Sequence, residues 1–541
     1  MLVNYSDMPG FPNLFLDYIY EFENVQKFYH KNFLDNNSYV KTFEQLKNFV
    51  RPHRNDLTNI LEDQYLGYVQ SKVTEDNIKA LNNENTFTVV TGQQVTLFGG
   101  PLYTLFKIIT TIKLSNLLKE RFSEYNFVPV FWMEVDDHDF KEIQSVNIID
   151  KYNKLKTITY DDGLEDETNR GSIGNLKFNL NINQTLDELE GSLRDNEFKE
   201  EIVRLISGCY EDGVTIKAAF KRLIFNLFDE YGLIIFNPID NRVKDLLLPI
   251  FEKEIDNYEI HSKENILRSA ELEENYHAQV KVNPMNLFYS DDSGRHLIEP
   301  VDDVFRFRGK RNRISKEELK KSLYYDPSTF SPNVLLRPIC QDYLFPTAVY
   351  IGGPAEVSYF AQVMPNYSFF NIVSPIVFPR ISATILEKHI ASSMNKYDLT
   401  FNEYLFDEKE LINKIIKHLS EYNLEELFND SKNNIQEVLL KLKSSLTAID
   451  SSLSDISEKS LNRIIQSLEI LQTKSEDYQA RQHGDVVNNV KKIRSFVYPN
   501  NNLQEREISF ISFANKYGLS FVKWLINELV TNKADHQVIE L

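Results

Sequence analysis

Acidic side chains and a histidine crowd the stretch FWMEVDDHDF, which closes an apolar run typical of a β-strand. The stretch contains Glu134, Asp136, Asp137, His138 and Asp139. Like charges this close together repel one another and lower the stability of the folded protein, so their presence favours a specific role. The cluster could bind a metal ion, hold a substrate ammonium group or supply a general base, and a solvated acidic loop is the alternative. We favour function and select Asp137 and His138 as catalytic residues.

A glycine turn, TGQQVTLFGGPLYTLFK, separates the apolar run TFTVV from an amphipathic helical pattern. It fits no standard phosphate-binding fingerprint. Gly100 and Pro101 predict a helix start, with Gly100 as N-cap, where backbone amides attract anions. Tyr103 and Lys107 would share one face of that helix. Open α/β sheets bind ligands at the carboxyl ends of their strands, which adds Thr91, Gln93 and Gln94 as ligand-binding candidates. An ordinary capped strand–helix connection is the alternative.

A second Gly-Gly-Pro helix start lies within LLRPICQDYLFPTAVYIGGPAEVSYFAQV. Glu356 falls in the first turn of the predicted helix, where capping alone is the alternative role. Arg337 is expected at the end of a strand, NVLLRPI, and a pair with Asp342 is its alternative role. We expect both helix N-termini to face one cleft. The ligand-binding candidates from this segment are Arg337, Asp342, Gly353, Glu356 and Tyr359.

The remaining polar motifs favour structural roles. RISKEEL superficially resembles the lysine loop of class I synthetases, but Ser315 and Glu318 predict a capping box. His261, His277 and His296 stand alone in polar stretches and are predicted at the surface. Cys340 has no base beside it in the sequence and is predicted to be a packed small residue.

The elements that must position these residues form an α/β core. Strand–helix–strand units predict about five core strands in a parallel sheet. Two polar insertions interrupt the core, the second with short antiparallel strands that include AQVKVNP. The predicted divisions are 1–150 (N-terminal helices and first part of the core), 151–215 (first insertion), 216–255 (core), 256–330 (second insertion), 331–384 (end of the core), 385–500 (helical stalk) and 501–541 (a tail that packs back).

The stalk carries apolar residues three or four positions apart from Leu446 to Leu471, with one interruption. This spacing predicts a long helix packed on a partner helix. We favour a dimer seam, because an exposed apolar stripe needs a partner, and an intramolecular hairpin is the alternative.

The 541-residue chain has a net charge of -19, which argues against nucleic acid or an anionic membrane as its partner. Two distant cysteines suit a reducing cytoplasm, where we expect the protein to act. No metal ligand is singled out, and whether a metal is needed stays open.

The motifs VVTGQQVTLFGGPLYTLFK, PVFWMEVDDHDFKEI, SPNVLLRPICQDYLFPTAVYIGGPAEVSYFAQV and LQERE together resemble the cysteine-adding enzymes (cysteine ligases) of bacillithiol biosynthesis, over essentially the whole chain. The resemblance implies a Rossmann-like core with two connective insertions and a C-terminal coiled coil that makes a homodimer. It also implies a ligase that joins cysteine to the amine of glucosaminyl-malate through an amide bond.

That reaction suggests roles for the selected residues. A free carboxylate must be activated before it forms an amide, and ATP is the expected source, through an acyl-adenylate or an acyl-phosphate. The helix starts at Gly100 and Gly353, with Lys107 and Arg337, would stabilise developing charge. Asp137 or Glu356 would hold the cysteine ammonium group.

His138 would be the base for the sugar amine, and Arg380, in VFPRIS, would bind the malate carboxylates. The family resemblance also suggests a separate nucleotide site, with candidates Ile385, Leu386, Glu387, Lys388 and Arg506. The competing hypotheses are a non-catalytic dimeric scaffold and a synthetase-like enzyme for another amino acid.

Overall fold

The computed structural model describes residues 1–397, 399–419 and 423–541. It divides into two compact units. The first comprises Met1–Thr384 and Gln504–Ile539, and the second comprises Ile385–Leu503 and Glu540–Leu541. The cleft described below lies in the first unit.

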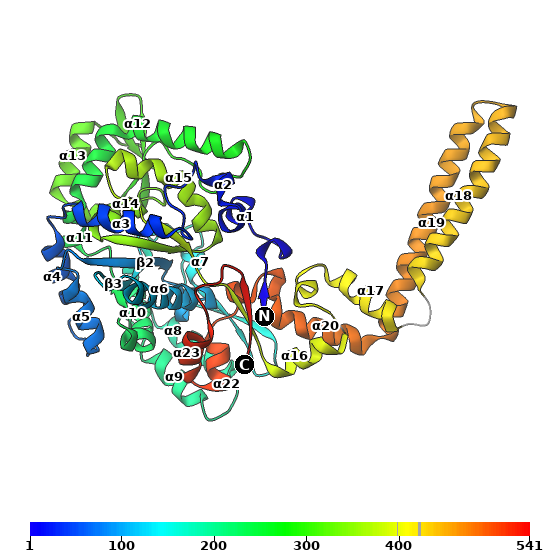
Figure 1. Ribbon diagram of the computed structural model, residues 1–541, viewed down its shortest axis with the longest axis horizontal. Helices are drawn as coiled ribbons and strands as arrows, with labels where there is room; N and C mark the ends of the chain where they lie inside the picture. The colour runs from blue at the N-terminus through cyan, green and yellow to red at the C-terminus, as the bar shows by residue number, and fades with distance from the viewer. Residues whose placement is uncertain (398, 420–422) are drawn as a thin grey trace. The chain divides into compact units, whose positions relative to one another are not determined.

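A five-stranded parallel sheet forms the core of the first unit (Figure 1). Its order is β13 (Ile376–Pro379), β12 (Thr347–Gly352), β2 (Thr86–Gln94), β3 (Asn126–Glu134) and β6 (Ile234–Phe236). The register pairs Gln94 with Glu134 and Ile351 with Thr91, so the polar strand ends meet at one edge of the sheet. The predicted α/β core of about five strands is confirmed.

Helices cover both faces of this sheet. Helix α6 (Leu102–Arg121) joins β2 to β3, α10 (Ile216–Phe228) precedes β6, and α15 (Pro354–Phe370) joins β12 to β13. Since β3 and β13 lie on opposite sides of the β2–β12 pair, right-handed crossovers place α6 and α15 on opposite faces. The strand order therefore reverses between β2 and β12, which is where such sheets bind ligands.

Helix α6 differs from its predicted amphipathic character, because it is buried along most of its surface. Helix α21 (Gln504–Glu507) packs against it. The hydroxyls of Thr110, Thr111 and Ser115 in α6 donate to carbonyls one turn earlier in the helix, which satisfies them without water. The two chain ends also meet, since β1 (Leu2–Val3) pairs antiparallel with β15 (His536–Glu540).

A second, antiparallel sheet has the order β10 (Arg313–Ile314), β9 (Val304–Phe307), β8 (Gly294–Val301), β7 (Leu287–Asp291) and β11 (Phe330–Pro332). Two predicted strands are wrong. AQVKVNP contains no strand, and NVLLRPI leads into helix α14 (Arg337–Leu344). The Asn333 side chain accepts the Leu335 and Leu336 amides, which starts a helix instead of a strand.

Helix α12 (Leu248–Glu273) runs through the division predicted between residues 255 and 256 and has a kink at Asn257.

One of the three histidine predictions is confirmed, because the His277 side chain is exposed. His261 on α12 is fully buried against Glu254, and only 11% of the His296 side chain is exposed. Ser315 and Glu318 form the predicted capping box of α13 (Lys316–Tyr325).

The remaining elements of the first unit surround this core. They are α1 (Asn13–Tyr20), α2 (Phe22–Val25), α3 (Asn36–Asn48), α4 (Arg54–Gln64), α5 (Lys72–Ala80), α7 (Phe140–Ile143), the hairpin β4 (Ser145–Ile149) and β5 (Leu155–Thr159), α8 (Asn181–Ser192), α9 (Lys199–Ser207), α11 (Asn241–Leu246), α22 (Ile511–Tyr517) and α23 (Ser520–Glu528). Strand β14 (Ala383–Leu386) spans the division between the two units.

The second unit is helical. It contains α16 (Lys388–Met394), α17 (Glu408–Leu419), α18 (Leu424–Ile449), α19 (Leu453–Gln482) and α20 (Gly484–Val497). Helices α18 and α19 lie side by side as a hairpin (Figure 1). The prediction of one long helix is wrong, because the chain turns back at residues 450–452, where the Asp450 side chain accepts the Ser452 amide. Within the described ranges, no helix is both long and apolar enough to cross a bilayer.

Candidate functional site

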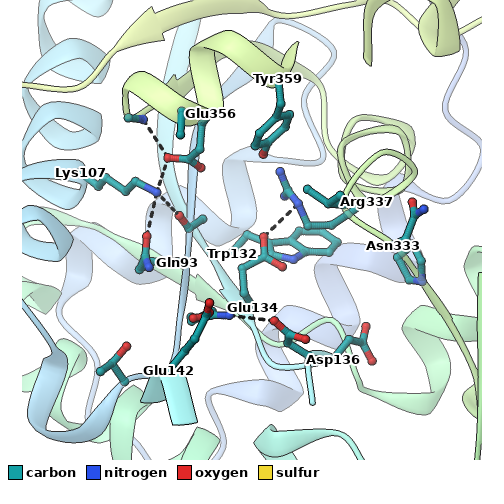
Figure 2. Close-up of a pocket in the computed structure, with 18 of the residues that line it drawn as sticks. Gln93, Lys107, Trp132, Glu134, Asp136, Glu142, Asn333, Arg337, Glu356 and Tyr359 are labelled. Atoms are coloured by element: carbon teal, nitrogen blue, oxygen red, sulfur yellow. Dashed lines mark hydrogen bonds and ion pairs between the residues drawn. The ribbon is translucent and has the colours of Figure 1, made fainter. Parts of the chain in front are cut away.

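A cleft of about 890 Å³ opens at the carboxyl ends of β2, β3 and β12, beside the N-termini of α6 and α15. Figure 2 shows its side chains converging from these elements and from α14. The walls mix carboxylates, cations, aromatic rings and amides, in keeping with a polar ligand rather than an apolar one.

Lys107 lies fully buried at one end of the cleft and has three acceptors (Figure 2). Its Nζ lies 2.8 Å from the Gly92 carbonyl, 2.8 Å from Gln93 Oε1 and 2.5 Å from Glu356 Oε2. Although burial favours the neutral acid, Lys107 lowers the pKa of Glu356. With all three ammonium protons engaged, Lys107 holds β2 against the start of α15.

Glu134 and Arg337 form the central ion pair, with Arg337 Nε 3.0 Å from Glu134 Oε1 (Figure 2). Arg337 also donates to Gln341 and to the Tyr350 hydroxyl, which in turn donates to Glu356. Burial raises the pKa of Glu134 to about 7, against the attraction of Arg337. This carboxylate is therefore tuned to exchange protons near neutral pH.

Asp136 and Asp137 are held by other segments, whereas Asp139 is the N-cap of α7. Asp136 pairs with Lys244 at 2.7 Å. Asp137 accepts from Gln94 at 2.8 Å and from the His138 amide at 2.7 Å. Burial opposes ionisation of Asp137, but its bonds to His138 and the attraction of Arg295 hold its pKa well below the usual range. Asp137 is thus a fixed anion rather than a proton carrier.

A cationic end of the cleft lies around Tyr103. Arg380 stacks over the Tyr103 ring and pairs with Glu505 at 2.7 Å. Arg506 also lines the cleft, is exposed, and forms no ion pair within the described residues. Arg506 is thus the cation most available to an anionic ligand. The described part of the chain contains no group of three or more His, Cys, Asp or Glu side chains able to hold a metal ion.

Comparison with known proteins decides the family. The model of the BshC N-terminal Rossmann-like domain of bacillithiol biosynthesis matches residues 1–381. The model of the BshC C-terminal coiled-coil domain matches residues 383–541. The chain belongs to the BshC family.

Full-length relatives in the BshC family agree with this result. A protein named "Putative cysteine ligase BshC" from Salinibacter ruber is 33% identical over 98% of this chain and 96% of its own length. Proteins of the same name from Chlorobaculum tepidum and Natranaerobius thermophilus are 32% and 31% identical over 98% and 95% of this chain, and over 97% and 94% of their own lengths. A solved structure described as a "putative arginyl t-RNA synthetase" from Campylobacter jejuni aligns with a TM-score of 0.23 at 10% identity over 83% of this chain and 97% of that one, a likeness too slight to inform the fold.

The BshC cleft brings together most of the residues selected from the sequence. Those that line it are Gln93, Gln94, Tyr103, Lys107, Asp137, His138, Arg337, Gly353, Glu356, Tyr359, Arg380 and Arg506. Gly353 is the N-cap of α15, with its amide bonded to Glu356. Both Gly-Gly-Pro segments border this one cleft, as expected, because Pro101 and Gly353 line it.

Three selected residues of the first unit do not line the cleft. Thr91 donates to the Ile351 carbonyl within the sheet. Gly100 is not the N-cap of α6, because Pro101 holds that position and Gly100 has a φ of 71° that suits glycine. Asp342 bonds to Gln341 and Tyr367 in the core, where burial raises its pKa to about 6, and does not pair with Arg337.

Four of the five residues predicted for a separate nucleotide site lie at the end of β14 and the start of α16, in the second unit, whereas the fifth, Arg506, lines the cleft. Ile385, Leu386, Glu387 and Lys388 are not among the residues that line the cleft.

Sequence reasoning missed several cleft residues. Glu134 was noted in the acidic stretch but not selected, although its position at the last residue of a buried strand was the available signal. Arg295, Asn333, Trp132 and Glu142 also line the cleft. Arg295 and Asn333 come from the second insertion and its junction with α14, and nothing in the sequence connected these segments to the strand ends.

Gly92 lies so close to the Glu134–Arg337 pair that a side chain added at this position tests the geometry of the pair. A Cβ at Gly92 would lie 3.0 Å from Glu134 Oε1 and 3.7 Å from Arg337 Nη1. We expect Gly92→Ala to lower turnover about tenfold or more by displacing the carboxylate. Steady-state kinetics checks this, with Gly191→Ala as control, since a Cβ at Gly191 meets open space. Equal turnover in Gly92→Ala and wild-type protein would show that the position of Glu134 is unimportant.

Proposed function

We propose that the protein is a ligase that adds cysteine to the amine of glucosaminyl-malate and forms an amide bond. Family membership and the cysteine ligase name of the relatives support this role. The structural observation that carries it is the Glu134–Arg337 pair inside a cleft with a cationic end. Such a cleft provides a group that can accept a proton from an amine and cations that can bind carboxylates.

The two ends of the cleft suit the two ends of the acceptor substrate. We place the malate carboxylates at Arg506 and Arg380, beside Tyr103 and the first turn of α15. The amine would then lie toward Glu134, at the centre of the cleft. Glu142, exposed at the cleft wall, is a candidate for the cysteine ammonium group together with the predicted Asp137 and Glu356.

We further propose that a nucleoside triphosphate, with ATP the expected one, activates the cysteine carboxylate. The nucleotide supplies a leaving group that the free carboxylate lacks. In the cleft, Arg506 and Arg380 are assigned to the malate carboxylates, and Lys107 has no proton left to donate to phosphate oxygens. The separate nucleotide site at residues 385–388 stays a prediction.

Two residues compete for the role of general base. His138 was selected from the sequence, and its Nδ1 lies 3.3 Å from both Asp137 and Arg295. Glu134 is more deeply placed and has a pKa of about 7, so we assign the base to Glu134 and give His138 a role in holding Asp137.

The function is tested by incubating purified protein with cysteine, glucosaminyl-malate and ATP in the reducing conditions of the cytoplasm, where we expect it to act. We expect the mass of the amide product and consumption of the nucleotide. Serine and glucosamine serve as controls for the donor and for the malate group. No product with any nucleoside triphosphate would reject the proposal.

We also propose that the protein is a homodimer through the α18–α19 hairpin. Apolar side chains remain exposed on this hairpin, with Leu440 58% and Ile449 77% exposed. We expect Leu440→Glu to convert a dimer to a monomer, since a buried unpaired charge is costly. Light scattering gives the mass, with the exposed Lys441→Glu as control. A monomeric wild-type protein, or a dimeric Leu440→Glu variant, would contradict this assignment.

A further inference from the structure

A line of buried polar side chains leads from α12 to the wall of the cleft. It begins with Glu254 and His261, both fully buried and paired across the kink at Asn257. The His261 ring stacks on Phe369 with its centroid 4.7 Å away. Burial disfavours the imidazolium, but Glu254 outweighs burial and raises the pKa of His261. The pair therefore favours a charged, fixed arrangement.

Asn286 continues the line. Its backbone amide and its side-chain Nδ2 donate to Glu254 Oε1 at 2.8 and 3.0 Å. Its Oδ1 accepts from Asn333 Nδ2 at 2.7 Å, and its carbonyl accepts the Asn333 amide at 2.9 Å. These two asparagines flank β7 and β11, which pair in register at Leu287 and Pro332. The line thus crosses from α12 through the end of the second sheet.

Asn333 connects the line to the cleft, which it lines (Figure 2). Its Oδ1 accepts the Leu335 and Leu336 amides at 3.0 Å each, and its carbonyl accepts the Arg337 amide at 2.9 Å. Asn333 therefore shapes the first turn of α14. Arg337 is the first residue of that helix, and its guanidinium pairs with Glu134.

The buried Glu254 carboxylate is bonded to His261 and to the backbone and side-chain amides of Asn286. A buried acid–histidine pair is a weak source of stability, because desolvation offsets most of the attraction between the charges. The hydrogen bonds that run from Glu254 through Asn286 to Asn333 do, however, fix one arrangement of the segments that they join. Here the joined segments are α12, the β7–β11 end of the second sheet and α14.

We propose that Glu254, held by His261, is a positioning residue that acts through Asn286 and Asn333 to set the first turn of α14 and thereby the place of Arg337 beside Glu134. The consequence for catalysis rests on the proposed function. The positioning itself concerns the Glu134–Arg337 pair and can be measured without substrate.

Trp132 provides the measurement. It lines the cleft two residues before Glu134, and Trp524→Phe leaves it as the one tryptophan of the chain. We expect its fluorescence to titrate with a midpoint near pH 7, and Glu134→Gln should remove that transition. The charged groups around Glu134 are Arg337, Glu356, Lys107, Asp136 and Arg295. Of these groups, Arg337 contacts Glu134 directly, and the proposal is that the line from Glu254 sets the position of Arg337.

In this background, we expect Glu254→Gln to raise the midpoint by about one pH unit, because a displaced Arg337 no longer favours the carboxylate. The matched control is Asn77→Ala, which removes a buried amide bonded to Gly232, before the first residue of β6 and so at the opposite end of the sheet. This control should lose stability without moving the midpoint.

A second variant decides the matter if Glu254→Gln does not fold. Asn333→Ser keeps a side-chain oxygen for the α14 amides but is too short to reach Asn286, and we expect the same upward shift. The proposal is overturned if a folded variant of either kind keeps the parent midpoint, if Asn77→Ala shifts it equally, or if the parent shows no transition that Glu134→Gln removes. Because no turnover is measured, failure of the ligase assay would leave this result intact.

Discussion

Glu134→Gln is expected to lower kcat by about a hundredfold or more, the range for loss of a general base. The substitution keeps the shape of the side chain but removes the group that would take the proton from the attacking amine. Gln can still accept the bond from Arg337, so the fold should be retained. Rapid-quench or steady-state measurement of product checks the rate, and the melting temperature checks the fold.

The pH dependence sharpens this expectation. A base works when deprotonated, so the wild-type rate should rise as pH increases through about 7, the pKa of Glu134. Glu134→Gln should lose that rise, whereas His138→Ala should retain it at a reduced rate. If His138→Ala removes the pH-dependent rise and Glu134→Gln leaves it in place, the base is His138.

Lys107→Met is expected to be the most destabilising single change in the cleft. It removes the partner of Glu356 and leaves a carboxylate, 20% exposed, without its cation. Removing one member of a buried ion pair costs about 3–5 kcal/mol in free energy of unfolding. Denaturant unfolding measures this cost at neutral pH.

Two further variants show whether the loss comes from the pair. Lys107→Met with Glu356→Gln should recover a large part of the loss, because no unpaired charge remains. Lys113→Met, on the same helix, removes a lysine bonded to the Ile526 carbonyl but to no carboxylate, and should have a much smaller effect. A Lys107→Met protein as stable as wild type would mean that the Glu356 carboxylate is satisfied without Lys107.

The sequence was informative about the parts of the cleft made from consecutive residues. Apolar runs followed by polar residues predicted β2 and β3, and the pairing of their carboxyl ends brought Gln94 and Glu134 together as expected for a parallel sheet. The second Gly-Gly-Pro segment was predicted correctly, because N-cap, proline and Glu356 all follow local rules for helix starts.

Partners from distant segments were not predictable in the same way. Lys244 and Arg295 neutralise Asp136 and Asp137 from α11 and from the second sheet, and no local pattern connects them. Lys107 looked available for catalysis because its three acceptors are contributed by the fold. His261 looked exposed because its neighbours in sequence are polar, yet the kink in α12 turns it toward Glu254.

The hairpin of the second unit shows the same limit. The spacing of apolar residues correctly indicated helices packed on a partner. The prediction of one continuous helix from Leu446 to Leu471 was wrong, because the chain turns at Asp450. The spacing of apolar residues shows which face of a helix is apolar, but it does not show where one helix ends and the next begins. The only local sign of a break was a single aspartate between two stretches with the same apolar spacing.

Transfer of an oxygen atom tests the central claim most directly. Cysteine labelled with ¹⁸O in its carboxylate, incubated with glucosaminyl-malate, ATP and the protein, should transfer one labelled oxygen to the nucleotide product. Mass spectrometry should find the label in AMP if the intermediate is an acyl-adenylate, or in inorganic phosphate if it is an acyl-phosphate. Amide product without label in either, or no product at all, would contradict a nucleotide-activated ligase.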